Sequence, residues 1–309
     1  MTLKDKITHK KGGYLFYGLT PPKTSTDPEK IAGIAQRQKE RLQNLDIDGL
    51  ILYDIQDETS RNNAPRPFPF MSTLDPDVYV NEYLTDLNVP KIIYKSVGKF
   101  TPNSLKSWLR KNENTIDLAV FVGAPSKNQE VSLSLEQAYQ IKNESHSSIK
   151  LGGVTIPERH VVKGDEHLRL MNKANNGCDF FISQCVHNLD NAKDMLSDYY
   201  FYCLENNIEL KPIIFTLTPI GSLKTLEFTK WLGIDIQRWL ENELKVSKDI
   251  LNASMGICRY VAQDLILFAK EKNIPIGFNI ESVAIRKAEI DASILLVKEV
   301  KEMMENTKN

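Results

Sequence analysis

Acidic side chains directly follow several predicted β-strands, at places where a carboxyl group can do acid–base chemistry. Asp54, Asp57 and Glu58 follow the second predicted strand, and Glu158 and Glu281 follow two later ones. In a barrel of parallel strands the carboxyl ends of all strands meet at one face, and catalytic side chains lie there. A carboxyl group held at that face can donate a proton to a bound substrate. The sequence therefore offers five candidates for a general acid.

An amide, a thiol and three histidines are also residue types suited to a site. Gln184 ends a predicted strand, which favours a ligand-facing amide over a polar strand end that satisfies backbone groups. Cys185 comes next, where a buried thiol is usually inert. His160, His167 and His187 match no zinc template, and their separations are long. We therefore expect no metal site.

The bulk composition narrows the class of protein. Of 309 residues, 41% are hydrophobic and 26% are charged, which is enough for a substantial core. The 39 Lys and Arg residues nearly balance the 40 Asp and Glu residues, so no global field favours a nucleic acid or an anionic membrane as partner. No apolar run approaches the roughly 20 residues that cross a bilayer, and the basic N-terminus lacks a signal peptide's apolar core, so we expect it to fray. Four cysteines without a C-x-x-C pair fit a soluble, cytoplasmic protein.

Short β-branched or aromatic runs alternate with helical patterns, which predicts parallel strands joined by crossover helices. No G-x-G-x-x-G turn follows the first strand, which favours a closed barrel over a doubly wound sheet. No linker rich in Gly or Ser divides the chain. We therefore predict a single-domain α/β fold, a (β/α)8 TIM barrel over residues 1–309. Its strands are predicted at Tyr14–Leu19, Gly49–Tyr53, Lys91–Lys95, Leu118–Gly123, Lys150–Ile156, Phe180–Ser183, Pro212–Leu217 and Pro275–Ile280.

The helical signals include a start at Asp27, whose side chain can cap the helix, with Pro28 as its first residue. Apolar stripes predict another helix over Ser247–Lys272 and a last one around Ile290 and Val297.

The segment Asn62–Pro76 after the second strand is long and proline-rich, as ligand-facing loops of barrels often are. We interpret it as a lid. Phe68 and Phe70 in this segment are candidate substrate contacts, because aromatic rings can stack on a planar ligand.

Four motifs, read in chain order, resemble the methylenetetrahydrofolate reductase family. Pro21–Thr24 is similar to the end of the family's F-E-F-F-P-P-K-T, and Ile156–His160 to its Y-P-E-x-H. Gly177–Asn188 (GCDFFISQCVHN) resembles its G-A-D-x-x-x-T-Q-F-F-F-D, with Gln184 on the family glutamine. Ile213–Leu232 resembles its P-I-I-x-G-I-x-P-I segment. The similarity spans nearly the whole chain and is weakest from residue 56 to residue 148.

This resemblance implies a barrel that holds FAD and passes a hydride from NAD(P)H to methylenetetrahydrofolate, giving methyltetrahydrofolate. The ligand would then be a small-molecule folate. The residues it assigns to FAD are Glu158, His160, Glu166 and Lys173, and those it places near the folate and nicotinamide are Gln184 and Thr218.

Two acidic residues of the family are replaced here. Its first-strand glutamate, the general acid on the folate, aligns with Gly18, and the aspartate of its R-G-D aligns with Ala124. General-acid help is worth roughly 10²–10⁴ in rate, so another group must replace it if reductase activity is retained. Asp57 and Glu58 are the first candidates for that role, with Asp54, Glu158 and Glu281 as the others.

Two hypotheses follow. The chain is a divergent reductase, with FAD or with direct transfer from the nicotinamide, or it is a folate- or flavin-binding homologue or partner subunit without redox chemistry. Fold similarity alone does not choose between them. Homo-oligomerisation stays open, since amphipathic surface helices do not by themselves identify a subunit contact.

Overall fold

Eight parallel strands form a closed barrel in the described part of this computed structural model, which covers residues 1–58, 64–124 and 131–307. The strands follow one another around the barrel in chain order, and β8 pairs with β1 to close it. The (β/α)8 prediction is confirmed. The strands are β1 Tyr14–Leu19, β2 Gly49–Leu52, β3 Lys91–Ser96, β4 Leu118–Val122, β5 Lys150–Thr155, β6 Phe180–Cys185, β7 Ile213–Leu217 and β8 Ile276–Glu281.

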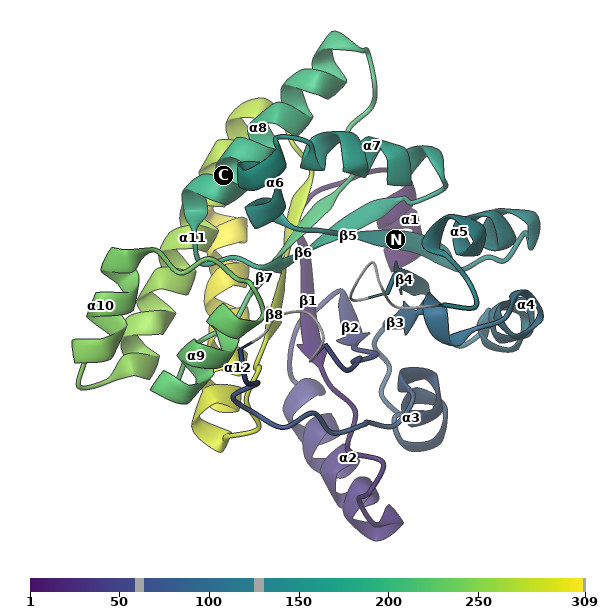
Figure 1. Ribbon diagram of the computed structural model, residues 1–309, viewed down its shortest axis with the longest axis horizontal. Helices are drawn as coiled ribbons and strands as arrows, with labels where there is room; N and C mark the ends of the chain where they lie inside the picture. The colour runs from purple at the N-terminus through teal and green to yellow at the C-terminus, as the bar shows by residue number, and fades with distance from the viewer. Residues whose placement is uncertain (59–63, 125–130, 308–309) are drawn as a thin grey trace.

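Helices surround the sheet as an outer layer (Figure 1). The last two helices agree with the predictions: one ends at Lys272, as predicted, and the other includes both Ile290 and Val297. The helices are α1 Leu3–Thr8, α2 Pro28–Leu42, α3 Pro76–Tyr83, the 3₁₀ helix η2 Val97–Lys99, α4 Pro102–Asn112, α5 Leu135–Glu144, α6 Pro157–Lys163, α7 Glu166–Asn175, α8 Leu189–Glu205, α9 Leu223–Trp231, α10 Arg238–Val246, α11 Ile250–Lys272 and α12 Lys287–Asn306.

Two helix starts differ in detail from the predictions. Asp27 precedes α2 as expected, but its side chain makes no capping hydrogen bond and instead lies 2.9 Å from Lys30 Nζ. Helix α11 begins at Ile250 rather than near Ser247, because Asp249 accepts a hydrogen bond from the Asn252 backbone N–H at 3.0 Å. A side chain that satisfies a free N–H of the first turn fixes where a helix begins.

The N-terminal segment is ordered as a helix, whereas its basic sequence predicts a frayed start. Residues Leu3–Thr8 form a helix with a capping box at Thr2, and Leu3 and Ile7 are buried. Both side chains join the cluster that fills the barrel interior, together with Tyr14 and Phe16 of β1. Helix α1 therefore packs against the apolar barrel interior, which the basic sequence around it conceals.

Side chains along each strand point alternately into the barrel and toward the surrounding helices, and this forms two separate hydrophobic cores. In β1, Phe16 belongs to the cluster inside the barrel, whereas Leu15 and Tyr17 belong to the larger cluster between the strands and the helices. This two-residue period places successive side chains on opposite faces of the sheet. Gly18 follows Phe16 on the inward face, at the end where the strand leaves the barrel.

The described part of the proposed lid, residues 64–76, packs along the rim of the barrel. Thr73 forms an isolated antiparallel bridge with Lys23, and Leu74 N–H donates to the Pro22 carbonyl at 2.9 Å. In Figure 1 this dark blue segment runs from beside α9 to α3. Asn62 and Asn63, which the lid prediction includes, lie outside the described residues.

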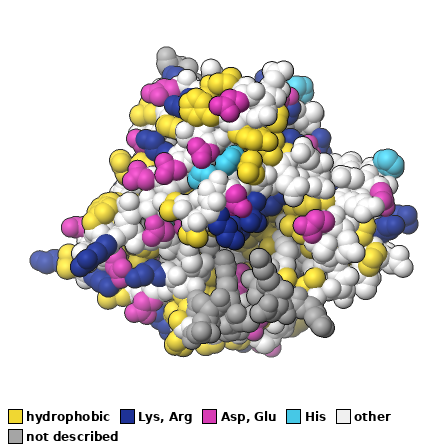
Figure 2. All heavy atoms as spheres, turned by 45° about the horizontal axis from the view of Figure 1, so that its top comes forward, with side chains coloured by type: hydrophobic (Ala, Val, Ile, Leu, Met, Phe, Trp, Pro, Cys, Tyr) yellow, Lys and Arg dark blue, Asp and Glu magenta, His cyan; other side chains and the backbone are white. Residues whose placement is uncertain are grey.

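The surface charges and the cysteines agree with the balanced charge and the absence of a C-x-x-C pair in the sequence. Figure 2 shows acidic and basic side chains interspersed on the face it draws. The four cysteines, all within the described residues, are buried and free. Among the described helices, none has both the length and the apolarity to span a membrane.

Candidate functional site

Strand pairing brings Gly18 and Glu281 together at the mouth of the barrel, where the strands end. Gly18 of β1 is the register partner of Glu281 of β8. A Cβ on Gly18 would lie 3.1 Å from Glu281 Oε2 and 2.9 Å from Cε2 of Tyr53. The Glu281 carboxyl group therefore stands in the space that a larger side chain at position 18 would enter.

The Glu281 carboxyl group is buried and has one side-chain partner within hydrogen-bond distance among the described residues. Its Oε1 lies 3.2 Å from the Cys185 thiol, which can donate to it. Its Oε2 is buried and has no hydrogen-bond partner within the described residues. Burial raises the pKa of Glu281, while the polar side chains around it act in the opposite direction. A buried carboxyl group whose pKa is raised holds its proton to a higher pH than a free one, and this is the property that a general acid needs.

Tyr53 and Asn279 complete the inner wall beside this carboxyl group. Asn279 Nδ2 donates to the Tyr53 hydroxyl at 2.8 Å and to Thr216 Oγ1 at 3.2 Å. Burial raises the pKa of Tyr53 well above its usual range, so its phenol stays neutral. Asn279 Oδ1 is buried without a partner among the described residues. An unsatisfied buried acceptor costs free energy, and a ligand with a matching donor would remove that cost.

A second acid, Glu158, is partly buried and lies at the start of α6. Burial raises the pKa of Glu158 to about 7, and its Oε1 lies 3.5 Å from the Asp235 backbone N–H. Its Oε2 is buried and unpaired in the part of the chain that the structure covers. Asp235 in turn accepts from Asn188 Nδ2 at 2.6 Å and from Asn191 Nδ2 at 3.1 Å. Burial raises the pKa of Cys185, and the carboxyl groups of Glu281 and, to a smaller extent, Glu158 raise it further.

Gln184, predicted to face the ligand, lies beside an irregularity in β6. The register of β6 against β7 shifts between Ile182 and Cys185, and such a bulge re-aims the side chains that follow it. Gln184 is partly exposed, and its Nε2 donates to the Leu232 carbonyl at 3.0 Å. The amide thus ties the end of β6 to the loop after α9, so Gln184 positions the rim of the mouth.

Two other side chains after β6 and β7 are buried. Thr218 Oγ1 has no partner among the described residues, and neither has His187 Nε2. Burial lowers the pKa of His187 to about 4, so the ring is neutral at physiological pH. Thr218 therefore remains a candidate contact for a ligand that enters from the carboxyl ends of the strands.

Of the four residues that the resemblance assigns to FAD, Glu166 and Lys173 are engaged within the protein, whereas Glu158 has an unpaired Oε2 among the described residues. Glu166 is fully buried and accepts from the Ile156 backbone N–H at 2.9 Å and from Arg159 Nη1 at 3.1 Å. Lys173 Nζ donates to the Val154 carbonyl. Glu166 and Lys173 thus hold β5, α6 and α7 together, and they do not fit the role of free contacts to a flavin.

His160, the last of those four residues, is buried and its Nε2 lies 3.1 Å from Asp198 Oδ2. This hydrogen-bond partner comes from α8, in the helical layer.

The lid candidates pack onto α9. The ring of Phe68 meets that of Phe228 edge to face at 5.3 Å, and the Arg66 guanidinium lies 4.9 Å from the Phe228 ring. Phe70 lies beside the same guanidinium at 5.8 Å. These aromatic residues are packing anchors of the segment, and both remain partly exposed.

Three further acids from the sequence analysis differ in their surroundings. Asp54 accepts from the Ser96 backbone N–H at 2.8 Å and pairs with Lys99 at 2.5 Å, so it joins the ends of β2 and β3. Asp57 and Glu58 raise the pKa of Arg66, against the larger lowering by burial, which places both near the lid. Of the five candidate acids, Glu281 is the one that strand register brings beside Gly18.

Sequence reasoning missed Tyr53 and Asn279 as parts of this wall. The available signal is the two-residue period, since Ile51 lies inside the barrel and Tyr53 follows it on the same face. Gly277, Asn279 and Glu281 share a face of β8 in the same way.

Comparison with known proteins gives a near full-length match. A solved protein from Clostridium thermocellum, which binds two copies of 5-methyl-5,6,7,8-tetrahydrofolic acid, is 49% identical, with 98% of this chain and 100% of that chain covered at a TM-score of 0.88. The 7,8-dihydropteroate synthase of Vibrio fischeri matches at 11% identity, 95% and 94% coverage and a TM-score of 0.47, which is too distant to bear on function. No protein-family model and no curated protein matches. At 49% identity over its length, the chain belongs to the same family as the Clostridium thermocellum protein.

Proposed function

We propose that this chain binds a reduced folate of the methyltetrahydrofolate type at the carboxyl ends of its barrel strands. The observation that carries the proposal is the 49% identity, over nearly the whole length, with a protein that binds 5-methyltetrahydrofolate. Barrels bind their ligands at this face. Here it holds Glu281 Oε2, Asn279 Oδ1 and Thr218 Oγ1, which are buried and have no hydrogen-bond partner among the described residues.

The chemistry of the mouth suits a pterin. The pterin ring carries N–H groups on its edge, and the carboxyl groups of Glu281 and Glu158 and the amide of Asn279 offer acceptors for them. The folate tail ends in a carboxylate and needs a cation. Arg66 and Lys224 supply positive charge at the rim, where Lys224 Nζ lies 4.7 Å from the Phe68 ring. The mouth of the barrel thus offers a flat pterin ring a wall of hydrogen-bond acceptors, and it offers the folate tail a rim of aromatic and cationic side chains.

Isothermal titration calorimetry with 5-methyltetrahydrofolate tests this proposal. We expect saturable binding by the wild-type protein. Gln184→Ala should weaken binding about tenfold, or about 1.4 kcal/mol, because the rim loses its tie to the Leu232 carbonyl. Gln140→Ala removes an exposed amide that pairs with Glu144 and should leave the affinity unchanged. Wild-type protein that releases no heat and shows no binding by equilibrium dialysis would reject the proposal.

A second candidate function is the reduction of methylenetetrahydrofolate by NAD(P)H. The observation that favours it is the position of the Glu281 carboxyl group, which occupies the space in front of Gly18. Gly18 aligns with the first-strand glutamate of the methylenetetrahydrofolate reductase family, which this chain lacks. A hydride from the nicotinamide would reduce the methylene carbon, and one carbon–nitrogen bond to that carbon would break. Glu281 would give its proton to the released nitrogen, and NAD(P)⁺ would leave. The alternative is a protein that binds folate without turnover, and an NAD(P)H oxidation assay separates the two.

A further inference from the structure

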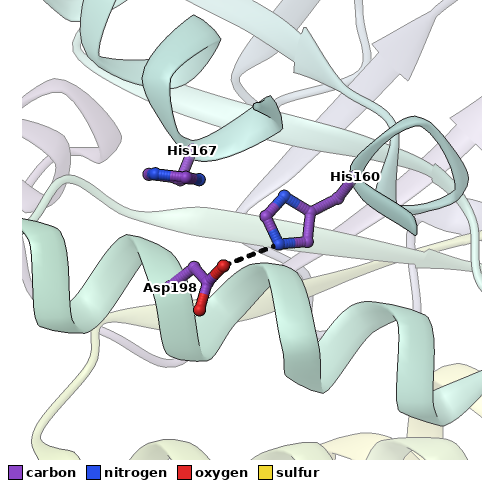
Figure 3. A group of neighbouring side chains, drawn as sticks. All are labelled: His160, His167 and Asp198. Atoms are coloured by element: carbon purple, nitrogen blue, oxygen red, sulfur yellow. Dashed lines mark hydrogen bonds and ion pairs between the residues drawn. The ribbon is translucent and has the colours of Figure 1, made fainter. Parts of the chain in front are cut away.

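Three side chains from three helices converge in the outer layer, away from the strands. His160 lies on α6, His167 on α7 and Asp198 on α8, and Figure 3 shows all three around one space. Each offers one ligand atom, and these atoms all lie within 4.8 Å of one another. The prediction of no metal site rests on the spacing of His160, His167 and His187 along the chain, which matches no zinc template. The structure replaces His187 in that set with Asp198, a residue 31 positions beyond His167 in the chain.

The two imidazoles are incompletely satisfied by the protein. His160 Nδ1 and His167 Nδ1 are both buried and have no hydrogen-bond partner in the described ranges. The centroids of the two rings lie 5.5 Å apart, with an angle of 76° between the ring planes. In a neutral imidazole one ring nitrogen carries a lone pair, so a ring nitrogen without a hydrogen-bond partner can present that lone pair to a metal ion.

We propose that His160, His167 and Asp198 form a binding site for a divalent transition-metal ion, with Zn²⁺ as the best fit. Two imidazole nitrogens and one carboxylate oxygen are ligands that Zn²⁺ takes, and water fills its fourth position. His160 is buried, whereas the Asp198 side chain is 56% exposed, so an ion can enter from solvent past the carboxylate. The bound ion would link α6, α7 and α8.

The site is independent of the proposed folate function, and its test needs no activity. Protein stripped with a chelator is titrated with ZnCl₂ by calorimetry, and its melting temperature is followed. We expect one equivalent per chain and a rise in melting temperature, because an ion that binds the folded chain stabilises it. With Co²⁺ instead, we expect the visible absorption of a four- or five-coordinate site.

Two variants decide whether these three side chains are the ligands. His167→Gln and Asp198→Asn should each weaken Zn²⁺ binding by about tenfold or more, since loss of even a group that only orients a ligand costs that much. His146→Asn removes an exposed histidine, and Asp194→Asn removes the same charge on α8 without removing a ligand. Both controls should bind Zn²⁺ as the wild type does. Absence of a stoichiometric Zn²⁺ complex, or a complex that both His167→Gln and Asp198→Asn leave unchanged, would overturn the proposal and leave a plain His160–Asp198 ion pair.

Discussion

Glu281→Gln is expected to lower the rate of NAD(P)H-dependent methylenetetrahydrofolate reduction by roughly 10²–10⁴-fold, the usual worth of a general acid. Glutamine keeps the size of the side chain and can still contact Cys185, but it has no acidic proton. Folate affinity should change much less than the rate. The measurement is single-turnover oxidation of NAD(P)H with saturating methylenetetrahydrofolate, compared with the binding constant from calorimetry.

The same role predicts the direction in which the reduction rate changes with pH. A general acid acts in its protonated form, and burial raises the pKa of Glu281 above that of a free carboxyl group. The wild-type rate should therefore be constant below this raised pKa and fall as the pH rises through it. In Glu281→Gln that step should disappear. Glu205→Gln, which removes an exposed carboxyl group at the end of α8, is the matched control and should keep both the rate and the profile.

Moving the acid back to β1 tests the geometry itself. In the double variant Glu281→Gly/Gly18→Glu, the Cβ of the new glutamate would lie 3.1 Å from the place that Glu281 Oε2 occupies in the wild type. The edge of the Tyr53 ring, 2.9 Å from that Cβ, must shift to make room for the new side chain. We expect this double variant to be faster than Glu281→Gly alone. If Glu281→Gln reduces the folate as fast as the wild type, the acid is elsewhere. If the wild type binds folate and does not oxidise NAD(P)H, only the binding proposal stands.

The fold could be read from the sequence because each strand carries its own local signal. β1 runs over Tyr14–Leu19, as predicted, since its apolar residues supply both the inner and the outer core. Errors appear where one long-range contact decides a boundary. The helix over Leu3–Thr8 is an example, because Leu3 and Ile7 are buried only once the barrel interior exists.

The site was less accessible to sequence reasoning, for a related reason. Glu281 is one of five plausible acids along the chain, and only the pairing of β8 with β1 singles it out. Gln184 has the family glutamine's place in the motif, yet the register shift in β6 directs its amide to Leu232. Closure of a barrel and a local bulge are both properties of strand pairs, so neither is encoded in a single segment.

Asp77→Ala is expected to lower the free energy of unfolding by about 3–5 kcal/mol, the usual loss when one partner of a buried ion pair is removed. Asp77 of α3 lies 2.5 Å from Lys95 Nζ of β3, and the two side chains are 9% and 3% exposed. The Lys95 ammonium also sits 5.4 Å from the ring centroids of Phe100 and Trp108. Asp75, at 3.5 Å and largely exposed, compensates only partly. Urea denaturation followed by circular dichroism measures the loss.

The double variant Asp77→Leu/Lys95→Met distinguishes a stranded charge from lost packing. It removes both charges and keeps apolar volume against Phe100 and Trp108, and replacing a buried ion pair in this way is often neutral. We therefore expect the double variant to be much more stable than Asp77→Ala. Asp86→Ala, which removes the exposed partner of Lys39, should cost little because solvent screens that pair. A double variant as unstable as Asp77→Ala would mean that packing, and not the unpaired Lys95 charge, accounts for the loss.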